Sequence, residues 1–151
     1  MKKQANVVGI IPARGGSKGV PKKNIKEFGG FPMIAYSIAA GQMSQKIDRC
    51  IVSTDSQEIA NIAKEYDADV PFLRPSEMAT DSSTDIEYIK HAISWFEENE
   101  GYIPDYWVLL RPTTPLREPQ LIDEAIFEIS NHAEATSLIS IHEFAESPAK
   151  M

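Results

Sequence analysis

The sequence lacks the residues and runs from which several common kinds of protein are built. Its 151 residues include one cysteine, Cys50, so neither a disulfide within the chain nor a zinc site made of several cysteines can form. No apolar run approaches the roughly 18 residues of a membrane-spanning helix, and the N-terminus has no secretory signal pattern. These absences predict a cytoplasmic protein without a membrane partner.

Familiar catalytic and metal-binding patterns are also absent. The histidines His91, His132 and His142 are scattered along the chain, and nothing about them predicts a metal site. No Ser-His-Asp or Cys-His arrangement is visible. Neither the Walker A spacing nor the G-x-G-x-x-G fingerprint occurs, so any phosphate-binding loop must have another form.

Acidic residues are missing from one end of an otherwise acidic chain. The formal net charge is −7, which argues against a nucleic-acid partner. Residues 1–26 nevertheless contain no acidic side chain and seven basic ones, namely Lys2, Lys3, Arg14, Lys18, Lys22, Lys23 and Lys26. A local basic segment that also carries glycines favours the capture of a compact polyanion, such as a triphosphate.

Short apolar runs alternate with amphipathic segments along the chain. Strands are predicted at residues 7–13, 49–54, 70–73, 106–110 and 135–141, and helices at 32–41, 56–66, 84–100 and 118–131. The proline in the 70–73 run predicts either an edge strand or the start of a strand. The length fits one domain, and the alternation predicts an α/β fold with an open, mostly parallel sheet flanked by helices.

Two helices have apolar positions that predict their inner faces. These positions are Ile86, Ile89, Ile93 and Phe96 in the 84–100 helix, and Leu121, Ile122, Ala125 and Ile129 in the 118–131 helix.

In an open parallel sheet, ligands bind beyond the carboxyl ends of the strands. This rule selects the loops at 14–24, around 55, at 74–83 and at 111–117. Asp55 ends a predicted strand at this edge, and it either contributes to the site or caps the following helix.

The strongest signal is the segment Arg14-Gly-Gly-Ser-Lys-Gly-Val-Pro-Lys-Lys-Asn24, which directly follows the first predicted strand. Gly15 and Gly16 let backbone N–H groups approach an anion without obstruction by a Cβ atom. Arg14, Lys18 and Lys23 supply charge-assisted hydrogen-bond donors. The segment is therefore predicted to bind phosphate groups.

Four motifs in order resemble those of the acylneuraminate cytidylyltransferases, also called CMP-sialic acid synthetases. They are the 14–24 segment, Val52-Ser-Thr-Asp55, Arg74-Pro-Ser-Glu77 with Asp81-Ser-Ser83, and Arg111-Pro-Thr-Thr-Pro-Leu-Arg117. The resemblance covers nearly the whole chain and implies a Rossmann-like nucleotidyltransferase fold. The related 3-deoxy-manno-octulosonate cytidylyltransferases usually lack the Gly-Gly-Ser-Lys-Gly run and are the second choice.

The resemblance implies a nucleotide site formed by the first and third motifs. The residues it assigns to nucleotide binding are Arg14, Gly15, Gly16, Ser17, Lys18, Lys23, Asn24, Arg74, Asp81, Ser82 and Ser83. Lys23 matches the lysine thought to act on the reacting α-phosphate, and Arg14 is expected to assist it. Lys22 is expected to face solvent, and Ser82 and Ser83 can also serve as a helix N-cap.

The fourth motif is expected to face the sugar substrate through Arg111, Thr113, Thr114 and Arg117. The family often has glutamine where this chain has Arg111. The arginine implies either another nonulosonic acid, such as legionaminic acid, or a substrate carboxylate held in a bidentate pair. For Arg117, a structural ion pair at a helix start is an equal alternative.

The implied reaction joins CTP to a 2-keto sugar acid and releases pyrophosphate, with Mg²⁺ as cofactor. The family's metal-binding aspartates belong to a late Asp-x-Asp motif, which this chain does not contain. Residues 1–151 are therefore expected to be the nucleotide-binding portion of a single cytidylyltransferase domain without its C-terminal part. A homodimer is expected from the family. A nucleotide-binding module without transfer activity and an inert structural fragment remain the alternatives.

Overall fold

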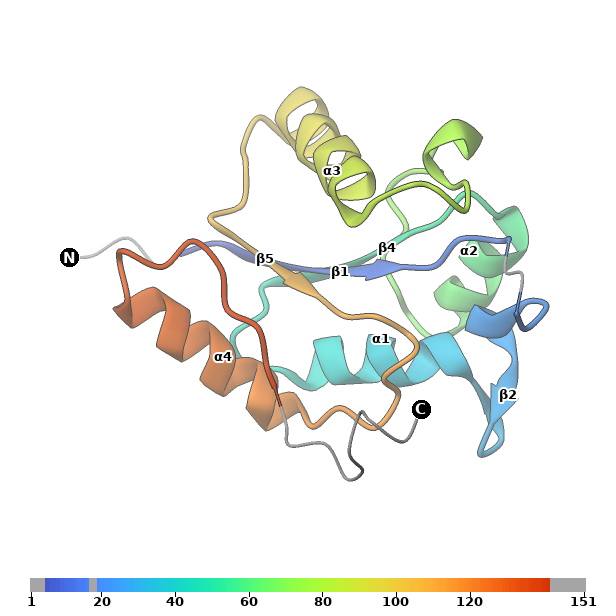
Figure 1. Ribbon diagram of the computed structural model, residues 1–151, viewed down its shortest axis with the longest axis horizontal. Helices are drawn as coiled ribbons and strands as arrows, with labels where there is room; N and C mark the ends of the chain where they lie inside the picture. The colour runs from blue at the N-terminus through green and yellow to red at the C-terminus, as the bar shows by residue number, and fades with distance from the viewer. Residues whose placement is uncertain (1–4, 17–18, 142–151) are drawn as a thin grey trace, which may run out of the picture.

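The computed structural model describes residues 5–16 and 19–141. The strands are β1 (Val7–Pro12), β2 (Glu27–Phe28), β3 (Phe31–Pro32), β4 (Arg49–Ser53) and β5 (Tyr106–Leu109). The α-helices are α1 (Met33–Met43), α2 (Gln57–Glu65), α3 (Asp85–Glu100) and α4 (Pro119–Asn131), and two short 3-10 helices are η1 (Lys23–Ile25) and η2 (Ser76–Met78). Figure 1 shows the sheet between α3 on one side and α1 and α4 on the other.

The central strand β1 pairs in parallel with β4 on one side and with β5 on the other. Ile10 lies opposite Ile51 of β4 and Leu109 of β5. Beyond β4, two isolated parallel bridges join Ile51 to Asp69 and Thr54 to Leu73. The predicted open parallel sheet with flanking helices is therefore confirmed.

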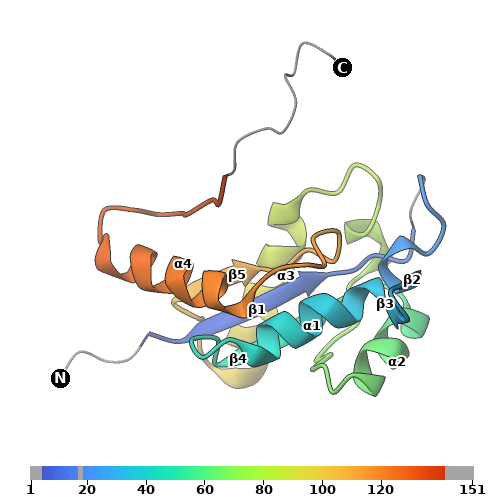
Figure 2. The same ribbon diagram turned by 90° about the horizontal axis from the view of Figure 1, so that it is seen from below.

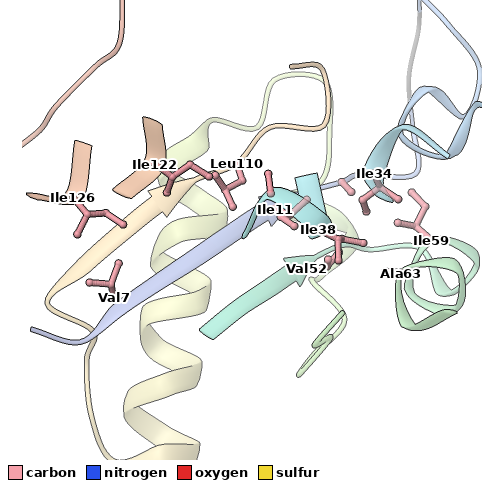
Figure 3. Packing of buried hydrophobic residues seen from close by; sticks show 12 residues of the cluster. Val7, Ile11, Ile34, Ile38, Val52, Ile59, Ala63, Leu110, Ile122 and Ile126 are labelled. Atoms are coloured by element: carbon pink, nitrogen blue, oxygen red, sulfur yellow. The ribbon is translucent and has the colours of Figure 1, made fainter. Parts of the chain in front are cut away.

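Both faces of β1 are buried because alternate side chains enter different cores. Ile11 packs with α1, α2 and α4 in the larger cluster, which Figure 3 shows from close by. Val8 and Ile10 pack on the opposite face with Tyr88, Ala92 and Phe96 of α3. A strand covered on both faces needs a continuous apolar run, which is what the first predicted strand has.

The predicted strand at 135–141 is wrong. Residues 135–141 form no strand in the structure, and Ile139 and Ile141 are 81% and 92% exposed. Figure 2 shows the segment leaving α4 outside the sheet. Apolar β-branched residues favour a strand only where a neighbouring strand offers hydrogen-bonding groups, and none in the described ranges does so here.

The predicted strand at 70–73 is reduced to the two isolated bridges beside β4. Pro71 lies between them, and its missing N–H prevents a continuous ladder. Its predicted position at the edge is nevertheless what the structure has within the described residues.

The inner faces of two helices differ from the predicted stripes. In α4, Ile122 and Ile126 are buried, whereas Leu121 is 56% exposed. In α3, Phe96 is buried as predicted, but Ile86 is 61% exposed, and Tyr88 and Ala92, which precede Phe96 at intervals of four residues, are buried instead. In each helix the buried residues are spaced four apart and face the sheet. Choosing the most apolar residues from the sequence does not identify this face.

The sequence analysis also missed the β2–β3 hairpin. Its turn is Gly29-Gly30, and both residues have positive φ angles, 59° and 88°. Two adjacent positive φ angles suit a tight two-residue hairpin and are accessible to glycine. The Gly-Gly pair between Phe28 and Phe31 was the available signal.

Cys50 is a half-buried residue near the start of β4. Burial, with a smaller contribution from Asp69, raises the pKa of its thiol to about 12, so the group stays uncharged. A Cβ atom at Gly41 of α1 would lie 2.5 Å from the Cys50 sulfur and 3.1 Å from Leu110 Cδ1. Glycine at position 41 therefore permits α1 to lie against β4.

We expect Gly41→Ala to lower the free energy of unfolding by about 1–3 kcal/mol, because the added methyl group overpacks the core. Helix propensity alone favours alanine by about 1 kcal/mol. A lower free energy of unfolding therefore indicates overpacking, and a higher one indicates helix propensity. Urea denaturation measures the change. Cys50→Ala in the same chain should recover most of the loss, and no recovery would contradict the proposed contact.

Candidate functional site

The carboxyl ends of β1 and β5 open onto a pocket of about 230 Å³. The loops after these strands form one side, and residues 74–88 form the other. Many of the residues assigned from the motifs line the pocket, namely Arg14, Gly16, Lys23, Asn24, Arg74, Ser83, Arg111 and Thr113. Motif residues far apart in sequence thus share one concave surface, at the edge where the rule for open sheets places a ligand.

The peptide group between Arg14 and Gly15 is held at both ends. Gly15 N donates a hydrogen bond of 2.8 Å to Asp55 Oδ1, and Asn24 Nδ2 donates one of 3.0 Å to Arg14 O. A Cβ atom at Gly15 would lie 3.1 Å from Ser56 Cβ, whereas at Gly16 it would meet nothing within 4 Å. Gly15 therefore packs against the start of α2, and Gly16 faces open space.

The two adjacent lysines of the first motif have different surroundings. Lys22 adopts the left-handed conformation with φ 52°, and its exposed side chain forms an ion pair of 2.6 Å with Glu58. Lys23 is half-buried and lines the pocket. The turn at Lys22 thus separates a surface lysine from one that faces the cleft.

Arg74 is the most buried charged residue in the described core, with 5% of its surface exposed. Its guanidinium lies 5.3 Å from the centre of the Tyr88 ring, a cation–π distance. Burial lowers its pKa, and the nearby Asp55 carboxylate acts in the opposite direction. Its Nε has no hydrogen-bond partner among the described residues, so a buried donor is left at the pocket wall.

Asp85 links two other residues of the wall. It accepts a hydrogen bond of 2.9 Å from the Tyr88 hydroxyl through Oδ1 and forms an ion pair with Arg111 through Oδ2. Burial, followed by the hydrogen bond to Asp85, raises the pKa of Tyr88 well above its ordinary value. Arg111 therefore meets the pocket with its charge already balanced by a carboxylate.

The segment from Thr80 to Thr84 is tied together by hydroxyl groups. Ser83 Oγ accepts a hydrogen bond of 3.0 Å from Thr80 N and lies 2.9 Å from Thr80 Oγ1, which is also 3.1 Å from Ser82 Oγ. The helix N-cap is Thr84, in a capping box with Glu87. Neither Ser82 nor Ser83 is the N-cap that the sequence offered as an alternative. Asp81 forms an ion pair of 2.7 Å with Arg14.

Several assigned residues lie outside the pocket lining. Asp81, Ser82 and Gly15 are adjacent to lining residues, and Thr114 contacts the same loop by donating its N–H to Arg111 O. Arg117 lines a separate groove with Tyr36 and Leu116, and no ion pair joins it to another described residue. Ser17 and Lys18 fall outside the described residues.

Asp55 does not cap α2, because Ser56 is the N-cap residue and its side chain accepts from Ile59 N. Asp55 instead holds Gly15. Reasoning from sequence missed Asp85, Tyr88 and Thr80 as pocket residues. The signal for Asp85 was its place at a helix start beyond the third motif.

The described residues do not form a ready metal site. Within 5–16 and 19–141 no three His, Cys, Asp or Glu side chains come together in a way that could hold a metal ion. The carboxylates nearest the pocket, Asp81 and Asp85, are each paired with an arginine. This part of the chain therefore does not fit a resident Mg²⁺.

Comparisons with known proteins give consistent results. A family model described as "Cytidylyltransferase" matches residues 8–148. The chain is 41% identical to an N-acylneuraminate cytidylyltransferase from Escherichia coli, and the alignment covers 82% of this chain and 28% of that protein. It is 39% identical to a CMP-N,N'-diacetyllegionaminic acid synthase from Legionella pneumophila (80% and 51%), and 37% identical to a pseudaminic acid cytidylyltransferase from Campylobacter jejuni (77% and 50%).

Among solved structures, a CMP:2-keto-3-deoxy-manno-octonic acid synthetase complexed with CTP aligns with a TM-score of 0.71 at 17% identity, over 85% of this chain and 49% of that one. A 4-diphosphocytidyl-2C-methyl-D-erythritol synthase aligns with a TM-score of 0.68 at 11% identity, over 97% and 68%. Both show a shared fold. The chain spans about half or less of the length of the three relatives named above. No helix in the described ranges has the length and apolarity needed to cross a membrane.

We expect Asp85→Ala to lower the free energy of unfolding by about 1–3 kcal/mol, because the buried Tyr88 hydroxyl loses its acceptor. Arg111→Ala should cost less than about 1 kcal/mol, since that ion pair is half exposed to solvent. Urea denaturation of both variants provides the comparison. In a Tyr88→Phe background the cost of Asp85→Ala should shrink, and an undiminished cost there would argue against the hydroxyl contact.

Proposed function

The chain belongs to the cytidylyltransferase family, and on this premise we propose that its pocket binds CTP for transfer of the cytidylyl group to a nonulosonic acid. The observation that carries the proposal is the convergence of Arg14, Gly16 and Lys23 with the buried Arg74 in one cleft. Basic side chains beside a glycine-bearing loop suit a triphosphate.

The triphosphate is assigned to the first loop. Arg14 and Lys23 line the pocket, and Gly16 leaves its backbone open to an approaching anion. Ser17 and Lys18, from the same loop, are proposed to complete the phosphate contacts. An entering phosphate would compete with Asp81 for the Arg14 guanidinium, which exchanges one charge-assisted pair for another.

The cytidine portion is assigned to the opposite wall. Arg74 has an unpartnered donor there, and Ser83 and Asn24 add polar groups that line the same pocket. A buried donor without a partner costs free energy until a ligand acceptor reaches it. The carbonyl and ring nitrogen of cytosine, or the ribose hydroxyls, are acceptors of the required kind. Asp81 and Ser82 are proposed to support this wall.

The sugar acid is assigned to the loop after β5. Arg111 and Thr113 line the pocket beside the phosphate loop, with Thr114 and Arg117 further along the same segment. The relatives named above act on N-acylneuraminate, N,N'-diacetyllegionaminic acid and pseudaminic acid. We therefore assign the substrate to this class of acidic sugars. Asp85 pairs with Nη2 of Arg111, and the guanidinium has further N–H donors with which it can meet a substrate carboxylate.

The proposed reaction is attack of the anomeric hydroxyl oxygen of the sugar acid on the α-phosphorus of CTP. The new P–O bond forms as the bond between the α-phosphorus and the oxygen that bridges to the β-phosphate breaks, pyrophosphate leaves, and the hydroxyl proton is released to solvent. Arg14 and Lys23 would orient the triphosphate and neutralise its charge, which is the main contribution a protein makes to phosphoryl transfer. A divalent cation, if bound, would add further charge neutralisation, but the described residues do not supply its ligands.

We expect Lys23→Ala and Arg14→Ala each to weaken CTP binding by about ten- to a hundredfold, because each removes a charge-assisted hydrogen bond. Isothermal titration calorimetry on this chain measures the affinity. Lys22→Ala is the matched control, since its side chain pairs with Glu58 on the surface, and should change the affinity by less than about twofold.

Three further measurements make the assignment specific. Cytidine without phosphate should bind the Lys23→Ala and unaltered chains alike, and Arg14→Ala should weaken CTP more than the sugar acid. The full-length protein should release pyrophosphate from CTP only with an acidic sugar of this class. Absence of CTP binding by the unaltered chain, or equal losses in the Lys22 and Lys23 variants, would contradict the proposal.

A further inference from the structure

Asp55 lies where the loops that follow β1 and β4 meet the buried Arg74. It directly follows Thr54 at the carboxyl end of β4, and Thr54 O accepts a hydrogen bond of 2.7 Å from Arg74 N. Its Oδ1 accepts the hydrogen bond from Gly15 N. Its negative charge acts against the lowering of the Arg74 pKa by burial. One half-buried carboxylate thus contacts the loop after β1 and influences the arginine of the other wall electrostatically.

The contact with Gly15 fixes the orientation of a single peptide plane. The N–H that Asp55 accepts and the C=O that Asn24 holds belong to the same peptide group, between Arg14 and Gly15. A peptide group held at both ends cannot rotate without losing two hydrogen bonds. Its orientation constrains the backbone between Arg14 and Gly15, directly before Gly16.

Helix capping does not account for Asp55. Ser56 supplies the side-chain cap of α2, and Ser56 N itself donates to Thr54 Oγ1 at 3.1 Å. The carboxylate is therefore directed across to the phosphate loop and not along its own helix. This is a contact between segments 40 residues apart in the sequence.

We propose that Asp55 is a positioning residue for nucleotide binding, which sets the first loop by holding the Arg14–Gly15 peptide together with Asn24. The inference rests on the proposed function of the cleft. In this role Asp55 does not touch the nucleotide. It acts through Arg14 and Gly16, which line the pocket, and its charge also balances that of Arg74 on the opposite wall.

The chain offers a matched control at the other end of the sheet. Asp48 also accepts a backbone hydrogen bond across about the same sequence distance, from Val7 N at 2.7 Å, but it precedes β4 and lies away from the cleft. Asp48→Ala therefore removes a similar structural contact without touching the phosphate loop. Asp55→Asn keeps an acceptor oxygen for Gly15 N and removes only the charge.

The test measures CTP affinity by calorimetry and Gly15 amide exchange by NMR in the ligand-free chain. We expect Asp55→Ala to weaken CTP binding at least about tenfold and to speed exchange of the Gly15 amide by a similar factor. Asp55→Asn should keep the amide protected and lose no more than about threefold in affinity. Asp48→Ala should lower the thermal midpoint while the folded protein binds CTP as the unaltered chain does.

The outcomes separate this inference from the function on which it rests. CTP affinity unchanged in Asp55→Ala, an equal loss in Asp48→Ala, or a loss in Asp55→Asn as large as in Asp55→Ala would each overturn the positioning role. Failure of the unaltered chain to bind CTP would overturn the proposed function itself, and the nucleotide role of Asp55 with it. An unchanged Gly15 exchange rate in Asp55→Ala would contradict the contact in the free protein as well.

Discussion

The parallel pairing of β1 with both of its neighbours is the constraint on which the rest of the structure depends. Ile11 of β1 is buried against α1, α2 and α4, and Ile10 is buried against α3. A strand covered on both faces by helices takes parallel neighbours through crossover connections. The crossovers place the carboxyl ends of all strands of the main sheet at the same edge. Loops that are distant in sequence then meet there without any further device.

Two arginines of the cleft are paired with carboxylates before any ligand arrives. Arg14 pairs with Asp81 and Arg111 with Asp85, and both aspartates belong to the segment that forms the opposite wall. Asp85 is also held by the Tyr88 hydroxyl through its other carboxylate oxygen, and it keeps that contact whether or not Arg111 stays paired with it. Arg111 can therefore turn to a ligand without leaving the Tyr88 hydroxyl unsatisfied.

Most of the fold could be predicted because its signals are local. The apolar run at 7–13 and the proline at 71 each indicate an element through short-range chemistry. The strand at 135–141 could not be judged in this way, since a strand depends on a neighbour that the local sequence does not encode. The inner face of α4 was missed for a related reason, because the direction of the sheet decides whether Leu121 or Ile126 is covered.

The motif residues were predicted from glycines and basic side chains, whereas the contacts of the carboxylates that organise them were not. An aspartate at a strand end is equally well explained as a helix cap, and only the distance from Asp55 to Gly15 separates the two interpretations. Asp85 opens a helix, where an acidic residue is favoured by the helix dipole alone. Its role in holding Arg111 and Tyr88 is a property of tertiary structure.

The two adjacent glycines of the first loop have different explanations, one in packing and the other in the proposed ligand. Gly15 is required by packing, because a side chain there would press against Ser56. Gly16 has no such requirement: a Cβ atom would meet nothing within 4 Å, and its φ angle is not in the left-handed region. Neither packing nor backbone strain in the free protein accounts for glycine at position 16. The close approach of a phosphate to main-chain N–H groups, as proposed for this loop, would account for it.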